Sequence, residues 1–173
     1  MVSNSGIGLL SLCIVVCSLT GSYANLRYLR TVAFSAQRTV DVPTPPQEET
    51  IGGYVMVRKD DNNFDASSGV FTAPFRGVYA FAFTFHQDFR ASRGPTDTTT
   101  VKLVKESVDG ATKTDVVESE SPLAPVGTPI SVPGASVLLE LDKGDKMFLA
   151  TSDDVDAAVI KPITFSGYLL TRL

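Results

Sequence analysis

The stretch at residues 64–83, Phe-Asp-Ala-Ser-Ser-Gly-Val-Phe-Thr-Ala-Pro-Phe-Arg-Gly-Val-Tyr-Ala-Phe-Ala-Phe, decides the fold. A turn region rich in Gly and Pro leads directly into an alternating strand. Because successive side chains of a strand point to opposite faces, one face should carry aromatic rings and the other small residues. The rings supply a large apolar area for a core. The small face leaves room for a second sheet or another subunit to approach closely. The aromatic face comprises Tyr79, Phe81, Phe83 and Phe85, and the small face comprises Val78, Ala80, Ala82 and Thr84.

Short strand-like segments separated by turn residues recur along the rest of the chain. No window of about a dozen residues shows the 3.6-residue period of an amphipathic helix. This pattern predicts an all-β sandwich. Asp109-Gly110 is the turn signal of a predicted hairpin. The predicted strands are residues 31–36, 54–57, 70–72, 77–87, 99–105, 113–118, 136–141, 147–151 and 163–171.

The first 24 residues differ in kind from the rest. An apolar run at 7–19 followed by small residues is typical of a secretory signal peptide, and we expect cleavage between Ala24 and Asn25. A membrane anchor at the amino terminus is the alternative, although the run is short for a bilayer span. Both cysteines lie inside this segment. The expected product is therefore extracellular, free of disulfides, and dependent on core packing or assembly for its stability.

After the signal peptide, residues 25–30 form a short lead and residues 31–173 a single domain. The net charge is −4 and the basic residues are scattered. Nucleic acids and anionic membranes both bind clustered cations, so neither is an expected partner. No further apolar run has the length of a membrane span.

The sequence does not predict an enzyme. It has no phosphate-binding glycine loop, nucleophile elbow or metalloprotease helix motif. The single histidine, His86, has no second histidine and no exported cysteine with which to hold zinc, so we expect a structural or surface residue. No catalytic residue and no metal ligand is predicted.

Two sets of loop residues are candidate binding sites. The acidic clusters are expected to be solvated loops, with a weak cation site as the alternative; they are Asp60, Asp61, Asp153, Asp154 and Asp156. Arg90 and Arg93 follow the aromatic strand, in a loop of the kind that carries binding residues on a rigid sandwich. An ordinary solvated loop is the alternative for both arginines.

Four separated segments resemble the globular head domain of complement C1q, in the superfamily that includes tumour necrosis factor. Residues 32–36 resemble its opening strand, 64–83 its signature, 136–145 a later strand and turn, and 165–170 its closing strand. The motif residues that carry the resemblance are Phe64, Asp65, Gly69, Phe71, Pro74, Gly77, Tyr79, Phe81, Phe83, Gly144, Asp145, Phe165 and Gly167.

The resemblance implies a jelly-roll β-sandwich of ten strands that packs as a homotrimer. The chain has no collagen-like Gly-x-y repeat, so it is similar to the head-only secreted form. That form implies a soluble, lectin-like pattern-recognition protein of innate immunity, whose ligands are microbial or cell-surface carbohydrates or proteins. The alternatives are a structural component of an extracellular matrix, including a mineralised matrix such as shell, and a cytokine-like receptor ligand.

The resemblance also bears on calcium and on individual residues. Some similar heads bind calcium through an aspartate at the position of Ser131, so no cofactor is predicted here. The residues that contact the ligand are not predicted. The motif glycines and Gly144-Asp145 are expected to serve turns or close strand approach. The residues expected in the core or the trimer interface are Phe71, Phe75, Tyr79, Phe81, Phe83, Phe165 and Tyr168.

Overall fold

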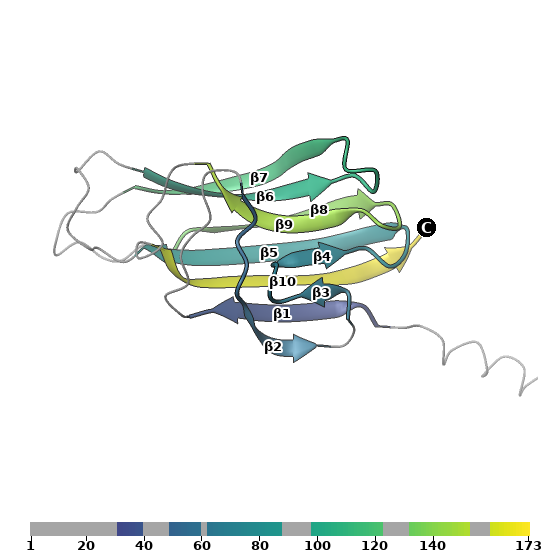
Figure 1. The fold of residues 1–173 in the computed structure, drawn as a ribbon, viewed down its shortest axis with the longest axis horizontal. Coiled ribbons are helices and arrows are strands. Elements are labelled where there is room, and N and C mark those ends of the chain that lie inside the picture. The colour runs from purple at the N-terminus through teal and green to yellow at the C-terminus, as the bar shows by residue number, and fades with distance from the viewer. Residues whose placement is uncertain (1–30, 40–48, 60–61, 88–97, 123–131, 153–159) are drawn as a thin grey trace, which may run out of the picture. The chain divides into compact units, whose positions relative to one another are not determined.

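The computed structural model describes residues 31–39, 49–59, 62–87, 98–122, 132–152 and 160–173, and Val32–Leu173 form one compact unit. Its described part consists of strands and turns without a helix (Figure 1). No helix among these residues is long and apolar enough to cross a membrane. The strands are β1 (Ala33–Arg38), β2 (Val55–Lys59), β3 (Phe64–Asp65), β4 (Val70–Thr72), β5 (Gly77–Gln87), β6 (Thr98–Glu106), β7 (Lys113–Pro122), β8 (Gly134–Leu141), β9 (Lys146–Thr151) and β10 (Ile160–Arg172).

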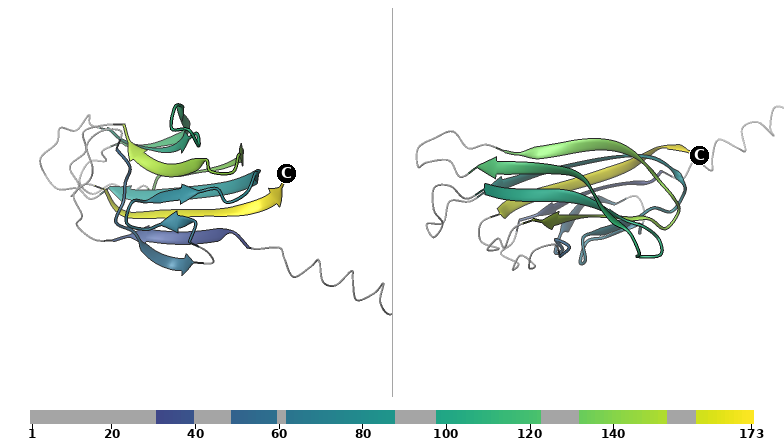
Figure 2. Two further views of the ribbon diagram at one scale, coloured as in Figure 1. Left: turned by 45° about the vertical axis from the view of Figure 1, so that its right-hand side comes forward. Right: turned by 90° about the horizontal axis from the view of Figure 1, so that it is seen from above.

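The strands form two antiparallel sheets of five. Sheet A has the order β2-β1-β10-β5-β8, and sheet B has the order β3-β4-β9-β6-β7. The two long strands β5 and β10 pair along almost their whole length at the centre of sheet A, as Figure 2 shows from two directions. This arrangement confirms the jelly-roll sandwich that the sequence predicted.

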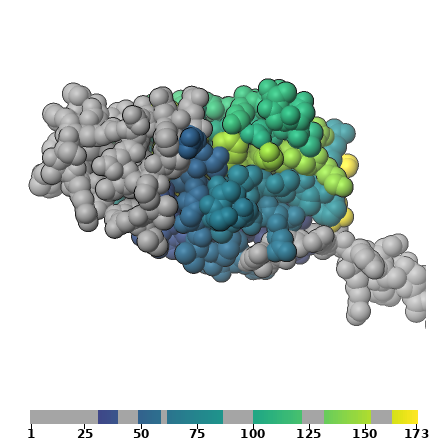
Figure 3. All heavy atoms as spheres, in the orientation of Figure 1, coloured from purple at the N-terminus to yellow at the C-terminus, as the bar shows by residue number. Residues whose placement is uncertain are grey.

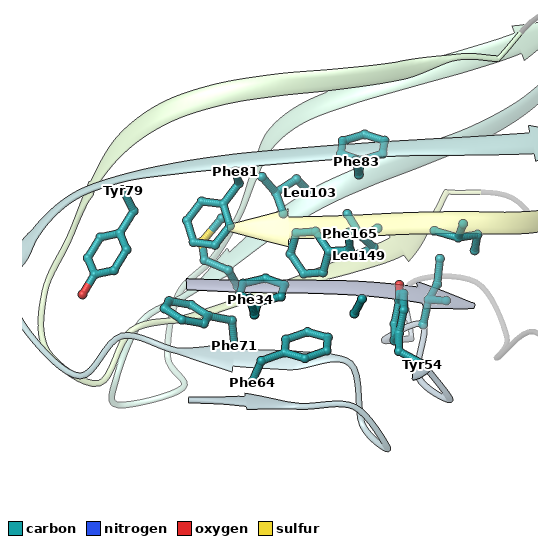
Figure 4. Close-up of a cluster of buried hydrophobic side chains, with 14 of the residues drawn as sticks. Phe34, Tyr54, Phe64, Phe71, Tyr79, Phe81, Phe83, Leu103, Leu149 and Phe165 are labelled. Carbon is teal, nitrogen blue, oxygen red and sulfur yellow. The ribbon is translucent and has the colours of Figure 1, made fainter. Parts of the chain in front are cut away.

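Aromatic side chains fill the space between the sheets (Figure 4). All four rings of the aromatic face of β5 are buried, with at most 2% of each residue exposed. The ring of Phe34 from sheet A stacks on that of Phe64 from sheet B, with centroids 4.3 Å apart, and Phe71 meets Phe81 edge to face at 5.4 Å. The alternation of β5 therefore points its rings at the second sheet and its small residues away from the core.

Only β4 and β5 have both predicted boundaries, and the other predicted strands differ by one to four residues at one or both ends. β1 begins at Ala33 and extends to Arg38, and β7 extends to Pro122 because it pairs with the whole of β6. The two-residue strand β3 was not predicted at all. Two residues carry no periodic pattern, and β3 exists only because Phe64 and Asp65 pair with β4.

Two of the motif glycines occupy conformations that disfavour a side chain. Gly69 has φ of 75° between β3 and β4, where a Cβ would collide with the carbonyl oxygen of Ile51. Gly167 lies directly beneath aromatic rings, and a Cβ there would come 2.6 Å from the ring of Phe81 and 2.7 Å from that of Phe34. Gly69 therefore lies in a turn, and Gly167 lies where the strand backbone closely approaches aromatic rings.

Candidate functional site

The small-residue face of β5 lies at the centre of an exposed surface on sheet A. Its neighbours in register form two rows across the sheet, Leu138–Ala80–Tyr168 and Ser136–Ala82–Ser166. Because alanine separates larger side chains in the first row, the surface is hollowed there. The hollow has a volume of about 280 Å³, and its walls come from β5, β8 and β10. We call these six residues the sheet A face.

Large apolar side chains stand out from the sheet A face and its surroundings. Leu138 is 65% exposed and Tyr168 51% exposed, and Leu170 beyond them is 49% exposed. The edge strand β2 adds Val55 and Val57, at 58% and 69%. Leu138 and Tyr168 border the same hollow, and an exposed apolar surface of this kind marks an interaction site rather than ordinary solvated surface.

Polar groups mark the two ends of the sheet A face. At one end the hydroxyls of Thr84 and Thr164 hydrogen-bond across β5 and β10 with an oxygen–oxygen distance of 2.6 Å. At the other end the Arg76 guanidinium lies 2.6 Å from a Glu140 carboxylate oxygen and 3.3 Å from one of Asp142. Between these ends the hollow is lined by alanine, serine, aliphatic and aromatic residues. Such a lining suits association with another apolar surface.

The structure separates the aromatic residues that the sequence grouped as core or interface. Five of them are buried in the core: Phe71, Tyr79, Phe81, Phe83 and Phe165. Phe75 is half-buried and packs under the Arg172 guanidinium, whose carbon lies 3.7 Å from the ring centroid. Tyr168 alone among them belongs to the sheet A face.

The carboxylates of the two motif aspartates accept hydrogen bonds within turns. The carboxylate of Asp65 accepts hydrogen bonds from the Ser67 hydroxyl at 2.7 Å and the Ser67 amide at 3.0 Å, and the Ser67 bonds lower the pKa of Asp65 below its ordinary value. Asp145 is buried beside Gly144, where φ is 95°. Its carboxylate accepts the amide of Asp142 at 3.0 Å and lies 2.8 Å from the Lys105 ammonium. Asp145 thus closes the turn between β8 and β9.

The remaining residues singled out from the sequence lie near β5 or outside the described ranges. His86 is half-buried near the end of β5 on the same side as the small residues. Pro74 is half-buried in the turn before β5, and Gly77 starts that strand, where a Cβ would collide with the Thr171 carbonyl oxygen. Outside the described residues lie Ala24, Asn25, Asp60, Asp61, Arg90, Arg93, Ser131, Asp153, Asp154 and Asp156. Within the described ranges, no group of three or more His, Cys, Asp or Glu side chains is placed to hold a metal ion.

A charged network on the outside of sheet B was missed by the sequence analysis. The Glu106 carboxylate, whose side chain is 15% exposed, lies 2.7 Å from the Lys146 ammonium and 3.4 Å from that of Lys113. The hydrogen bond from Lys146 and, to a smaller extent, the two positive charges lower the pKa of Glu106 below its ordinary value. These three residues come from different strands, so no local spacing in the sequence reveals them.

Replacing Glu106 by glutamine should remove a stabilisation that depends on pH. A carboxyl whose pKa is lowered on folding stabilises the fold above its ordinary pKa of 4.5, and this stabilisation is lost as the pH falls through the lower pKa of the folded state. We expect the variant to lose about 1 kcal/mol of unfolding free energy at about pH 7 and almost nothing near pH 3. Urea denaturation across this pH range measures the difference. Glu118→Gln, on exposed β7 surface, is the matched control. A gap between wild type and Glu106→Gln that stays constant with pH would contradict the assignment.

Comparison with solved structures finds the same fold in proteins of two kinds. The globular domain of zebrafish complement 1qA protein is 18% identical, with a TM-score of 0.64 over 82% of this chain and 98% of that one. Eiger TNF from S. frugiperda is 11% identical, with a TM-score of 0.65 over 83% of this chain and 95% of that one. Murine APRIL is 10% identical, with a TM-score of 0.58 over 80% of this chain and 100% of that one. At these identities the likeness shows the fold alone.

Comparison by sequence identifies one family. No curated protein matches the chain significantly. The family model described as C1q domain matches residues 33–170, which is nearly the whole of the unit that the structure describes. The chain therefore belongs to the C1q domain family.

Proposed function

We propose that this chain is a secreted, non-enzymatic recognition protein that assembles as a homotrimer through the sheet A face. The observation that carries the proposal is the exposure of Leu138 and Tyr168 on either side of Ala80, in a domain of the C1q family. Covering these side chains with a second and third copy removes apolar surface from water. A closed ring of three copies leaves no such face exposed.

Trimerisation also suits recognition of a repetitive surface. Three copies of a weak site bind such a surface with an avidity well above the affinity of one site. Microbial and cell-surface carbohydrates are repetitive ligands of this kind. We therefore propose lectin-like pattern recognition in innate immunity as the role, with residues 1–24 acting as the signal peptide and 31–173 as the recognition head.

The first experiment measures assembly and export. The full chain is expressed through a eukaryotic secretory route, and the secreted product is analysed by amino-terminal sequencing and by light scattering on a sizing column. We expect a first residue of Asn25 and a mass three times that of one chain. A clean monomer at micromolar concentration contradicts the trimer, and retention in the membrane fraction contradicts secretion.

The second experiment tests recognition. The secreted product is passed over insoluble microbial polysaccharides, with and without a calcium chelator. We expect retention in both conditions, because Ser131 replaces the aspartate that some C1q heads use for calcium. Loss of binding on chelation would overturn the calcium prediction. If no polysaccharide is bound and the protein is recovered from an insoluble matrix, the matrix alternative is favoured. If no polysaccharide is bound and the protein is found on a cell-surface receptor, the cytokine-like alternative is favoured.

A further inference from the structure

The outer side of sheet B has a small apolar cluster of its own, separate from the core. Val104, Phe148 and Ala150 are at most 4% exposed and pack with Val70, although they do not face the space between the sheets. Val104 pairs in register with Phe148 on β9 and with Asp115 on β7, so the cluster continues into polar residues toward the sheet edge. Figure 3 views this side, with the green β6–β7 hairpin beside the yellow-green β9.

Charged side chains lie around this apolar cluster. The Lys102 ammonium lies 3.0 Å from an Asp115 carboxylate oxygen; the lysine side chain is only 9% exposed, whereas that of Asp115 is 55% exposed. The Lys113 ammonium lies over the Phe148 ring, 5.6 Å from its centroid. Together with Glu49 these groups line an open hollow of about 650 Å³, which we call the sheet B hollow. Its volume falls within the usual range for ligand pockets.

The charges around the sheet B hollow balance. Two ammonium groups, on Lys102 and Lys113, face two carboxylates, on Glu49 and Asp115. An acidic ligand would meet the carboxylates and a basic ligand the lysines, so a ligand of either sign meets a like charge. A neutral ligand rich in hydroxyls meets no such penalty. Each hydroxyl can accept a hydrogen bond from an ammonium group and donate one to a carboxylate.

We propose that the sheet B hollow binds a neutral mono- or disaccharide. The inference rests on the proposed recognition function and names its site and ligand class. The position also fits the proposed assembly, because the sheet A face and the sheet B hollow lie on opposite outer faces of the sandwich. Three copies joined through sheet A would each keep this hollow open to a carbohydrate surface.

The test uses a paired substitution that removes donor and acceptor together. Lys102→Met with Asp115→Leu avoids leaving a buried charge without its partner, which would itself destabilise the fold. Saturation-transfer NMR titrations of the secreted product use methyl α-mannoside, methyl β-galactoside, N-acetylglucosamine and, as an acidic sugar, sialic acid. We expect the wild type to bind a neutral sugar and the double variant to bind it about tenfold more weakly or worse. Lys143→Met, in the exposed turn before β9, is the control and should bind as the wild type.

The outcomes separate this site from the function on which it rests. Equal binding by wild type and double variant, with both still folded by circular dichroism, would leave sugar recognition standing but overturn the sheet B hollow as its site. Preference of the wild type for sialic acid would overturn the neutral ligand class. Failure of the wild type to bind any sugar, in solution or as polysaccharide, would overturn the proposed function together with the hollow.

Discussion

Replacement of Phe165 by alanine should lower the free energy of unfolding by about 3–5 kcal/mol, the range measured for loss of a buried aromatic ring. Phe165 is fully buried at the centre of β10. Its ring meets Phe34 edge to face at 5.0 Å and Phe64 at 5.8 Å, and lies 6.1 Å from Phe81. It therefore touches both sheets, and these rings belong to rigid paired strands that cannot easily close the cavity. Urea denaturation followed by fluorescence or circular dichroism measures the loss.

The control for this prediction is on the same strand. Thr171→Ala changes an exposed residue of β10 and should alter the unfolding free energy by no more than about 0.5 kcal/mol. Both variants and the wild type must be compared at one protein concentration, because the stability of an oligomer depends on concentration. A loss below about 1 kcal/mol for Phe165→Ala would mean that the ring cluster is not the main core.

Ala82→Arg should separate the proposed trimer into monomers. Ala82 is exposed between Ser136 and Ser166 at the centre of the sheet A face. An arginine there would place a large cation in a dry apolar interface, with its charge stripped of water and unpaired. The side chain points away from the core, so the monomer itself should still fold. Light scattering on a sizing column should show the mass falling threefold, to that of one chain.

A matched substitution on the other sheet separates a surface effect from an interface effect. Thr72→Arg places the same side chain on an exposed strand position of sheet B, and its mass should equal that of the wild type. Circular dichroism checks that both variants keep their strands. If Ala82→Arg retains the wild-type mass while folded, the sheet A face is not the assembly surface.

The strand pattern of β5 shows which structural features the local sequence can predict. Alternation of large and small residues over 77–87 predicted the exact set of buried rings, because a strand has a two-residue period whatever surrounds it. The turns at Gly69 and Gly144 were predictable for a similar reason, since positive φ is easiest for glycine. In these places the physical cause acts between residues that are neighbours along the chain.

The pattern alone left open which sheet or subunit meets each face of β5. The stacking of Phe34 on Phe64 joins β1 to β3, which the sequence did not predict as a strand, so only the pairing of the sheets brings these rings together. The Lys102–Asp115 ion pair beside the apolar cluster on the outer side of sheet B likewise depends on β6 lying between β7 and β9. Nothing in the spacing of these residues along the chain distinguishes them from ordinary surface charges.

By itself, therefore, the amino-acid sequence determined that this chain folds as a sandwich, where its main turns fall and which face of β5 carries the buried rings, because those properties follow from backbone geometry and hydrophobicity over a few residues. Only the tertiary structure decided that the small residues of β5 face outward between Leu138 and Tyr168, and that opposite charges gather around Phe148. Both surfaces are assembled from strands distant in sequence, and such contacts are chosen by the packing of whole sheets rather than by any local pattern.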